Sequence, residues 1–267
     1  MIQSIKKIAI SLGLLSIFAI PSLAQCTLPN SAFQGGEFLQ YDLYFKYGLI
    51  NTKAGNASLR TTSTTYNGQS AYRIDMLTKS TGVVDAAFSV DDTLKAFVNT
   101  GLAPLAFFKY AHEDGDYNVE RINYTYANNA VSISTTRTKN GKHRYTETIN
   151  TNQCTYDFVS VVSFARALNY PAMKNGNRTR ISFISGKKRQ NMDIVLQGTE
   201  TIKANDGKKY SCYKLSLVTS DDAFQNKKEA MKIYLSADSN RIPIRIESSL
   251  KIGSMRVILK RSQGLKN

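Results

Sequence analysis

The residues best suited to acid–base or metal chemistry are few, and most of them lie in one short stretch. The chain has two histidines, His112 and His143, which leaves little material for a catalytic triad or a multi-histidine metal centre. His112 opens the acidic stretch 112–116, whose side chains could ligate a cation or assist a hydrolysis. Asp114-Gly115 is also an ordinary hairpin turn, and no calcium-loop spacing follows it. We therefore predict a turn there rather than a metal site, and a surface position for His143.

Paired carboxylates and the common cofactor motifs give no stronger signal. The neighbours Asp91-Asp92 and Asp221-Asp222 point to opposite faces if they lie in strands, so they cannot act together on one substrate. The sequence has no phosphate-binding glycine loop, no nucleophile elbow and no paired-cysteine redox motif. We predict no catalytic residues, no metal and no cofactor, and hence a protein that is not an enzyme.

The first 26 residues have the pattern of an export signal. Two lysines precede an apolar run from residue 8 to residue 20, which is too short to cross a bilayer, and Ser22 and Ala24 suit a cleavage site. We predict cleavage between Ala24 and Gln25, which removes residues 1–24 and leaves a periplasmic or secreted chain. A lipid anchor fits less well, because Gln25 rather than a small residue precedes Cys26. No second apolar run reaches membrane-spanning length, so we expect no transmembrane segment in the mature chain.

Three cysteines in an exported chain predict one disulfide and one remaining thiol. Cys212 falls in a predicted strand with an apolar face, whereas Cys26 and Cys154 fall in segments whose sequence predicts irregular structure. All three pairings stay open, and we favour Cys26 with Cys154. The cysteines are spaced too widely for a metal site.

The chain is basic, with a formal net charge of +15, and the excess lies in its C-terminal part. Residues 25–170 hold 13 Lys and Arg against 12 Asp and Glu, whereas residues 171–267 hold 20 against 8. For an exported protein this charge favours lipid phosphates, anionic polysaccharide or acidic protein surfaces as partners, and not nucleic acid. Lys187, Lys188 and Arg189 are the predicted anion-facing residues. The alternative is that the charge serves solubility alone.

Alternating apolar and polar residues predict strand after strand, joined by short turns. Residues 39–47 alternate in this way, and Asn67-Gly68 supplies two residues that tolerate positive φ in a hairpin turn. Residues 157–168 instead repeat apolar side chains at three- and four-residue spacing, which predicts a helix capped by Asp157. Residues 83–88 fit a short helix as well as an extended run.

These elements predict a mainly β fold, namely a large curved antiparallel sheet or open barrel of about a dozen strands with one helix near 157–168. We expect residues 25–267 to form a single β domain, and two β layers divided near 151–176 are the alternative. An open concave face would form an apolar cavity, although the same aromatic side chains could fill a closed core. The predicted lining residues are Tyr41, Phe45, Tyr72, Phe107 and Tyr124.

Several short motifs mark turns and strand ends along the chain. They are Gly36–Tyr41, Ala54-Gly55, Leu102–Leu105, the helix from Asp157 to Arg166, Tyr234–Pro243 and Gly253. On these motifs the chain resembles the exported bacterial family of domain of unknown function 3108 (DUF3108), and the resemblance covers about Gly36 to Arg261. The resemblance implies an envelope-located β protein and supplies no catalytic residues.

Two functional hypotheses follow from these observations. The first is a non-enzymatic binding or envelope-maintenance module that holds a hydrophobic or lipid-like ligand inside the sheet. The second is a structural or protein-interaction module with a closed core, which meets another envelope protein. A carboxylate-dependent hydrolase that uses residues near His112 ranks last.

Overall fold

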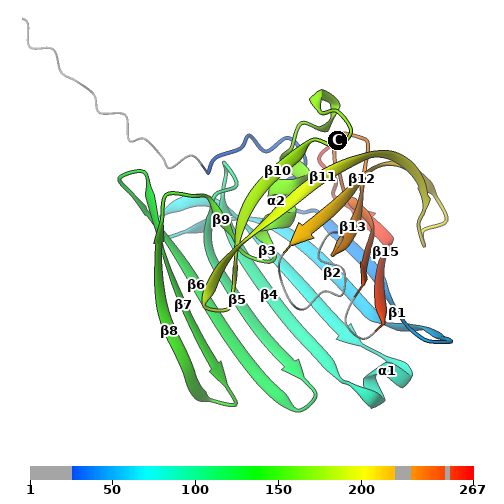
Figure 1. The fold of residues 1–267 in the computed structure, drawn as a ribbon, viewed down its shortest axis with the longest axis horizontal. Coiled ribbons are helices and arrows are strands. Elements are labelled where there is room, and N and C mark those ends of the chain that lie inside the picture. Colours follow the sequence, from blue (N-terminus) through cyan, green and yellow to red (C-terminus); the bar gives the residue numbers. More distant parts are fainter. Residues whose placement is uncertain (1–25, 220–229, 250–252) are drawn as a thin grey trace, which may run out of the picture.

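The structure, a computed structural model, describes residues 26–219, 230–249 and 253–267. Its strands form one curved sheet of 15 strands, so the predicted mainly β fold is confirmed (Figure 1). The sheet has more strands than the predicted dozen. One reason is that β9 has only two residues, which give no periodic signal in the sequence. The predicted signal segment and the Asp221-Asp222 pair lie outside the described residues.

The strands vary widely in length. They are β1 (Phe38–Tyr47), β2 (Ile50–Tyr66), β3 (Gln69–Ser80), β4 (Val90–Asn99), β5 (Pro104–Glu113), β6 (Asp116–Ala127), β7 (Ala130–Lys139), β8 (Lys142–Thr151), β9 (Thr155–Tyr156), β10 (Arg178–Ser185), β11 (Lys188–Lys203), β12 (Lys209–Thr219), β13 (Met231–Ser236), β14 (Pro243–Ser249) and β15 (Ser254–Gln263).

Chain neighbours are sheet neighbours in two long meanders. From β1 the strands run in chain order to β8 at one edge, and from β15 they run backwards to β9 at the other edge. The meanders join where β1 pairs antiparallel with β15, so the first and last strands lie side by side in the middle of the sheet. β9 pairs parallel with β10, and the other strand pairs are antiparallel, as the short connections predict.

The tight turns carry the residues that their backbone requires. Asn67-Gly68 has φ angles of 48° and 79°, and Asp114-Gly115 has 48° and 81°, the two successive positive values of a type I′ turn. Both predicted hairpin turns are thus confirmed. Gly55 serves a different need, because a Cβ at this position would lie 2.1 Å from the carbonyl oxygen of Lys79 on the neighbouring strand.

The helices are few and short. α2 (Ser160–Ala167) is the predicted helix, although it is shorter than the predicted 157–168, and the 3-10 turn η1 (Tyr170–Ala172) follows it. Asp157 caps it as predicted, since its Oδ1 accepts hydrogen bonds from the backbone N–H groups of Val159 and Ser160 at 3.0 and 2.8 Å. α1 (Gly82–Ala87) occupies most of the segment that the sequence left ambiguous. Among the described helices, none has the length and apolar character needed to cross a bilayer.

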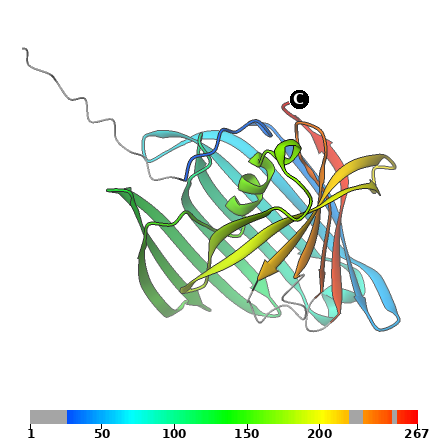
Figure 2. The same ribbon diagram turned by 45° about the horizontal axis from the view of Figure 1, so that its top comes forward.

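The sheet rolls around α2 so that its two edges approach each other (Figure 2). The turn between β10 and β11 reaches β7, where the hydroxyl of Thr135 donates to the carbonyl oxygen of Gly186 at 3.3 Å. We call the region where the two edges approach each other the seam. The end of the rolled sheet that holds α2 is the α2 end, and the opposite end, where α1 lies, is the α1 end (Figure 1).

Two apolar clusters fill the interior. The larger cluster extends across β1 to β7, where it includes Leu39, Ile74 and Ile122, and also takes in residues of β10 to β15. The smaller one lies between α2 and strands β10 to β13 and includes Ile194 and Leu215. α2 therefore packs against the second meander, and this contact fixes the helix within the curve.

Candidate functional site

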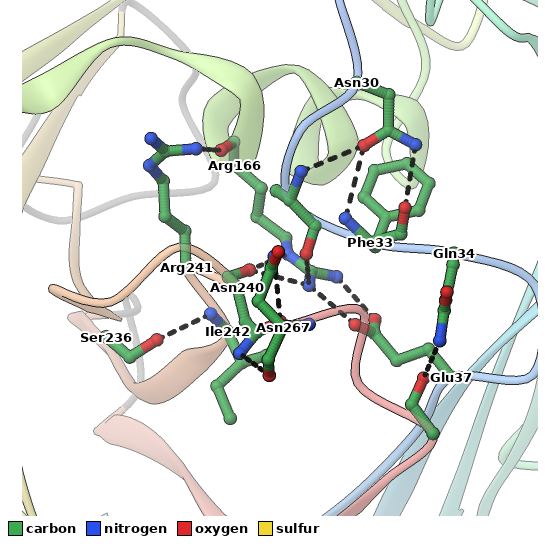
Figure 3. Close-up of polar contacts among 12 residues, drawn as sticks. Asn30, Phe33, Gln34, Glu37, Arg166, Ser236, Asn240, Arg241, Ile242 and Asn267 are labelled. Atoms are coloured by element: carbon green, nitrogen blue, oxygen red, sulfur yellow. Dashed lines mark hydrogen bonds and ion pairs between the residues drawn. The ribbon is translucent and has the colours of Figure 1, made fainter.

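A buried ion pair between Arg166 of α2 and Glu37, which directly precedes β1, lies at the α2 end (Figure 3). Nη1 and Nη2 of Arg166 lie 2.6 and 2.8 Å from the two carboxylate oxygens. The side chains of Arg166 and Glu37 are only 2% and 1% exposed. Nε and Nη2 also donate to the carbonyl oxygen of Asn240 at 3.2 and 2.8 Å, and Nη2 donates to that of Ala32 at 3.3 Å. We call this group of four residues the clasp.

The clasp is a structural joint rather than a ligand site. All three guanidinium nitrogens of Arg166 already have protein partners, so the charge is neutralised and enclosed. The C-terminus joins the clasp, because the N–H of Asn267 donates to Oδ1 of Asn240 at 2.9 Å. Three of the family-like motifs, those that contain Glu37, Arg166 and Asn240, thus meet at one place. Sequence reasoning missed the ion pair, because its partners are 129 residues apart.

Asp238 shapes the turn that presents Asn240 to the clasp. Its Oδ1 accepts hydrogen bonds from the backbone N–H groups of Asn240 at 3.0 Å and Arg241 at 3.1 Å. The hydroxyl of Ser236 donates to the same oxygen at 2.7 Å. Asp238 is therefore a turn residue, as the sequence predicts.

A groove of about 480 Å³ lies at the seam, between β10 and the connection from β8 to β9. Its volume falls within the usual range of small-molecule sites. The disulfide between Cys26 and Cys154 forms part of its wall. The apolar residues that line it are Leu28, Tyr156, Phe164 and Ile181. These four residues belong to the smaller core cluster or pack against it, so the groove opens directly onto that cluster.

The rim of the groove is polar and carries an exposed cation. Arg180 has a side chain that is 73% exposed, and its Nε donates to Oδ1 of Asp193 at 2.9 Å. This hydrogen bond raises the pKa of Arg180, so the guanidinium stays charged. Arg189 adds a second guanidinium, which donates to the hydroxyl of Ser182 at 2.8 Å and to Oε1 of Gln153. The polar lining residues are Asn152, Gln153, Arg180, Ser182 and Asn191.

A row of charged side chains crosses the concave face nearer the α1 end. Lys109, Glu120 and Arg137 are register partners on β5, β6 and β7, so they lie side by side on one face. Asp92 of β4 shares that face, and its Oδ1 is buried with no hydrogen-bond partner in the described part of the chain. Burial raises the pKa of Asp92 to about 6, while Lys109 lowers it and Glu113 raises it. The alternating charges largely neutralise one another.

The predicted disulfide between Cys26 and Cys154 is confirmed, with 5.1 Å between the Cα atoms. It ties the N-terminal segment to the start of β9 across a separation of 128 residues. Cys212 is the free thiol, and it is buried. Desolvation raises the pKa of Cys212 to about 12, which leaves it protonated and unreactive at neutral pH.

The five aromatic residues predicted to line a cavity lie away from the groove. Tyr41, Phe107 and Tyr124 are buried in the larger core cluster, Tyr72 packs against it, and Phe45 is half-buried on β1. The hydroxyls of Tyr41 and Tyr124 are buried without a hydrogen-bond partner among the residues described. Desolvation raises the pKa of both phenols. Their role as a ligand lining stays a prediction.

The remaining predicted site residues are dispersed. Lys187 and Lys188 are exposed at the turn between β10 and β11, and the exposed Arg189 beside them contacts the groove rim. His112 is exposed and stacks on Tyr117, with 4.3 Å between ring centroids. Within residues 26–219, 230–249 and 253–267, no group of three or more His, Cys, Asp or Glu side chains is placed to hold a metal ion.

Comparison with solved structures supports the fold. The chain is similar to the crystal structure of a β-barrel-like protein of domain of unknown function DUF1849 from Brucella abortus, with a TM-score of 0.62 and 12% identity over 88% of this chain and 100% of that chain. A "putative lipoprotein" from Parabacteroides distasonis matches at a TM-score of 0.33 and 13% identity over 89% of this chain and 99% of that one, which is too low to support an argument.

Comparison with sequences identifies the family. No curated protein matches the chain. The model of one family, described as "Protein of unknown function (DUF3108)", matches residues 40–260 and so covers nearly all of the described sheet. The chain therefore belongs to the DUF3108 family, as its motifs at the clasp and in the turns indicate.

Proposed function

We propose that the protein is a non-enzymatic binding module that holds an amphipathic, lipid-like anion in the seam groove. One observation carries this proposal, namely that the groove has an apolar floor, which includes Phe164, and an exposed cation, Arg180, among its polar lining residues. An acyl chain gains about 0.8 kcal/mol for each methylene group that it buries against such a floor. An anionic head group can accept charge-assisted hydrogen bonds from a guanidinium.

The groove is held in shape before any ligand arrives. The Cys26–Cys154 disulfide fixes one wall, and the rings of Tyr156 and Phe164 lie 4.8 Å apart on the floor. A site that is already ordered loses less conformational entropy when it binds. This supports binding of a preferred ligand shape rather than nonspecific adsorption.

Two further predicted residue sets extend the proposal. The unpaired hydroxyls of Tyr41 and Tyr124 need a polar partner, which a bound water or a polar ligand atom can supply. We assign the larger aromatic set, which lies away from the groove, to a separate interior ligand site. It consists of Tyr41, Phe45, Tyr72, Phe107 and Tyr124. We assign Lys187, Lys188 and Arg189 to attraction of the anion, because Arg189 contacts the groove rim.

The proposed setting is the cell envelope. The predicted cleavage between Ala24 and Gln25 would deliver the mature chain to the periplasm or outside the cell. The disulfide supports this setting, because such bonds persist in oxidising compartments. Binding in the groove requires no cofactor.

A fluorescent long-chain fatty acid, cis-parinaric acid, tests the proposal by titration into the purified protein. Phe164→Gln should weaken binding because it places an amide on the apolar floor. Arg180→Ala should weaken binding by about tenfold or more, because a charge-assisted hydrogen bond contributes about 1.5–3 kcal/mol.

Two matched variants control for unspecific effects. Phe158 is an exposed phenylalanine outside the groove, so Phe158→Gln should bind as the wild type does. Arg178 also pairs with Asp193, at 3.5 Å, but does not line the groove, so Arg178→Ala should retain affinity. Equal affinity of all four variants, or no binding by the wild type, would refute the proposal.

A second candidate function is protein interaction through the sheet edge. β8 is an edge strand ten residues long, so one row of its backbone groups is available to an added strand. A Pro substitution at Thr148 in β8 would block such pairing while leaving the groove intact. Loss of a co-purifying envelope protein, with unchanged fatty-acid binding, would favour this function.

A further inference from the structure

The tip of the β1–β2 hairpin carries three apolar side chains exposed to solvent. Leu49 has 105% relative exposure, and Tyr47 and Ile50 have 56% and 58%. Tyr47 and Ile50 are register partners, so their side chains lie on the same face of the hairpin. The tip projects beyond β15, whose first residue, Ser254, pairs with Lys46 (Figure 1). Exposed apolar residues gathered in this way mark a contact surface.

Basic residues surround this tip and define its collar. Lys46 is exposed directly before the apolar residues, and Lys53 follows them on β2. Arg256 of β15 reaches across the hairpin, where its Nη2 donates to Oδ1 of Asn51 at 3.2 Å. Asp42 offsets part of this charge, since Lys53 Nζ lies 2.7 Å from its Oδ1. The collar of Lys46, Lys53 and Arg256 therefore remains net positive.

Further apolar side chains lie at the same end of the sheet. α1 adjoins the start of β2, because the N–H of Thr81 donates to the carbonyl oxygen of Ala54 at 2.8 Å. No residue of α1 is buried, and Val83 and the following Phe88 are 68% and 50% exposed. The α1 end thus presents apolar residues on both sides of β2.

We propose that the hairpin tip docks on an anionic lipid bilayer. Tyr47, Leu49 and Ile50 enter the interface between head groups and acyl chains, and the basic collar faces lipid phosphates. The positive charge of the collar complements the negative charge of anionic lipid head groups, which favours a lipid surface as the partner. A stable protein partner would need about 800 Å² of contact on each side, far more than three side chains provide. This proposal goes beyond ligand binding, because the tip and the groove share no residue.

Flotation of the purified protein with vesicles tests the proposal. The vesicles contain phosphatidylcholine alone or phosphatidylcholine with phosphatidylglycerol. The wild type should float with the mixed vesicles, and the double variant Leu49→Asp, Ile50→Asp should lower the bound fraction about tenfold or more. Phe158→Asp is the matched control, since Phe158 is 58% exposed but lies beside α2, and it should float as the wild type does.

The groove variant Phe164→Gln separates docking from ligand binding. It should float normally, whereas the tip variant should retain its affinity for cis-parinaric acid. Flotation of the tip variant equal to that of the wild type, or absence of wild-type flotation, overturns the docking proposal. Loss of flotation in Phe164→Gln also overturns it, because vesicle binding would then arise from the groove.

Discussion

Two arginines at different places in the rolled sheet carry the same charge but have different roles. Arg166 is buried in the clasp, with both carboxylate oxygens of Glu37 and two backbone carbonyls as partners. Arg180 stands in solvent, where its Nε donates to Asp193, and it is one of the residues that line the groove. A satisfied buried charge joins parts of the chain, whereas an exposed charge beside apolar surface can recruit a ligand.

The largest effect should come from breaking the clasp. Arg166→Met leaves the carboxylate of Glu37 buried without its partner, which should lower the free energy of unfolding by about 3–5 kcal/mol. Arg180→Met should cost less than about 1 kcal/mol, because an exposed ion pair contributes little. Urea denaturation measures both values.

The double variant Glu37→Leu, Arg166→Met sharpens this test. It removes both buried charges, so it should recover much of the stability that Arg166→Met loses. An Arg180→Met variant as unstable as Arg166→Met would contradict the distinction between the two arginines.

The disulfide connects stability with the shape of the groove. Replacing Cys26 and Cys154 with Ser releases a long loop and should lower the free energy of unfolding by about 2–4 kcal/mol. Because the same bond forms a groove wall, affinity for cis-parinaric acid should fall in parallel. Unchanged affinity in a folded double variant would show that the disulfide does not shape the site.

The smallest predicted effect is on the pH dependence of the free energy of unfolding. The pKa of Asp92 is raised to about 6 in the folded state, against about 4 in the unfolded chain, so the folded state favours the neutral acid. The stability that this provides is present below pH 4 and is lost as pH rises through 6. After allowance for its partial exposure, Asp92→Asn should raise stability at pH 7 by about 1 kcal/mol and flatten the change between pH 5 and pH 7.

Thermal unfolding at the two pH values checks this prediction. Asp91→Asn is the matched control, because Asp91 is exposed on the opposite face and pairs with Lys79 at 3.1 Å. A wild-type pH profile retained in Asp92→Asn would contradict the role given to Asp92.

Local sequence signals predicted the local structure well. Asn67-Gly68 and Asp114-Gly115 determine their turns through backbone preference, and Asp157 caps its helix through bonds to the next turn. Residues 83–88 gave an ambiguous signal, because six residues are too few to separate the apolar spacing of a short helix from that of an extended run.

The candidate sites were harder to predict because they form between distant segments. The groove joins Leu28, Phe164 and Arg180, which only the rolling of the sheet brings together. The clasp likewise pairs Glu37 with Arg166 across the fold. The disulfide was accessible to sequence reasoning, because three cysteines leave few pairings.

Native mass spectrometry tests the central claim, binding in the seam groove, most directly. The full chain, including the predicted signal segment, is expressed and purified without detergent, and its native mass is compared with its denatured mass. We expect an excess mass that is released as a discrete lipid-like anion, and a reduced excess in Arg180→Ala but not in Arg178→Ala. A native mass equal to the denatured mass of the chain alone would contradict the claim.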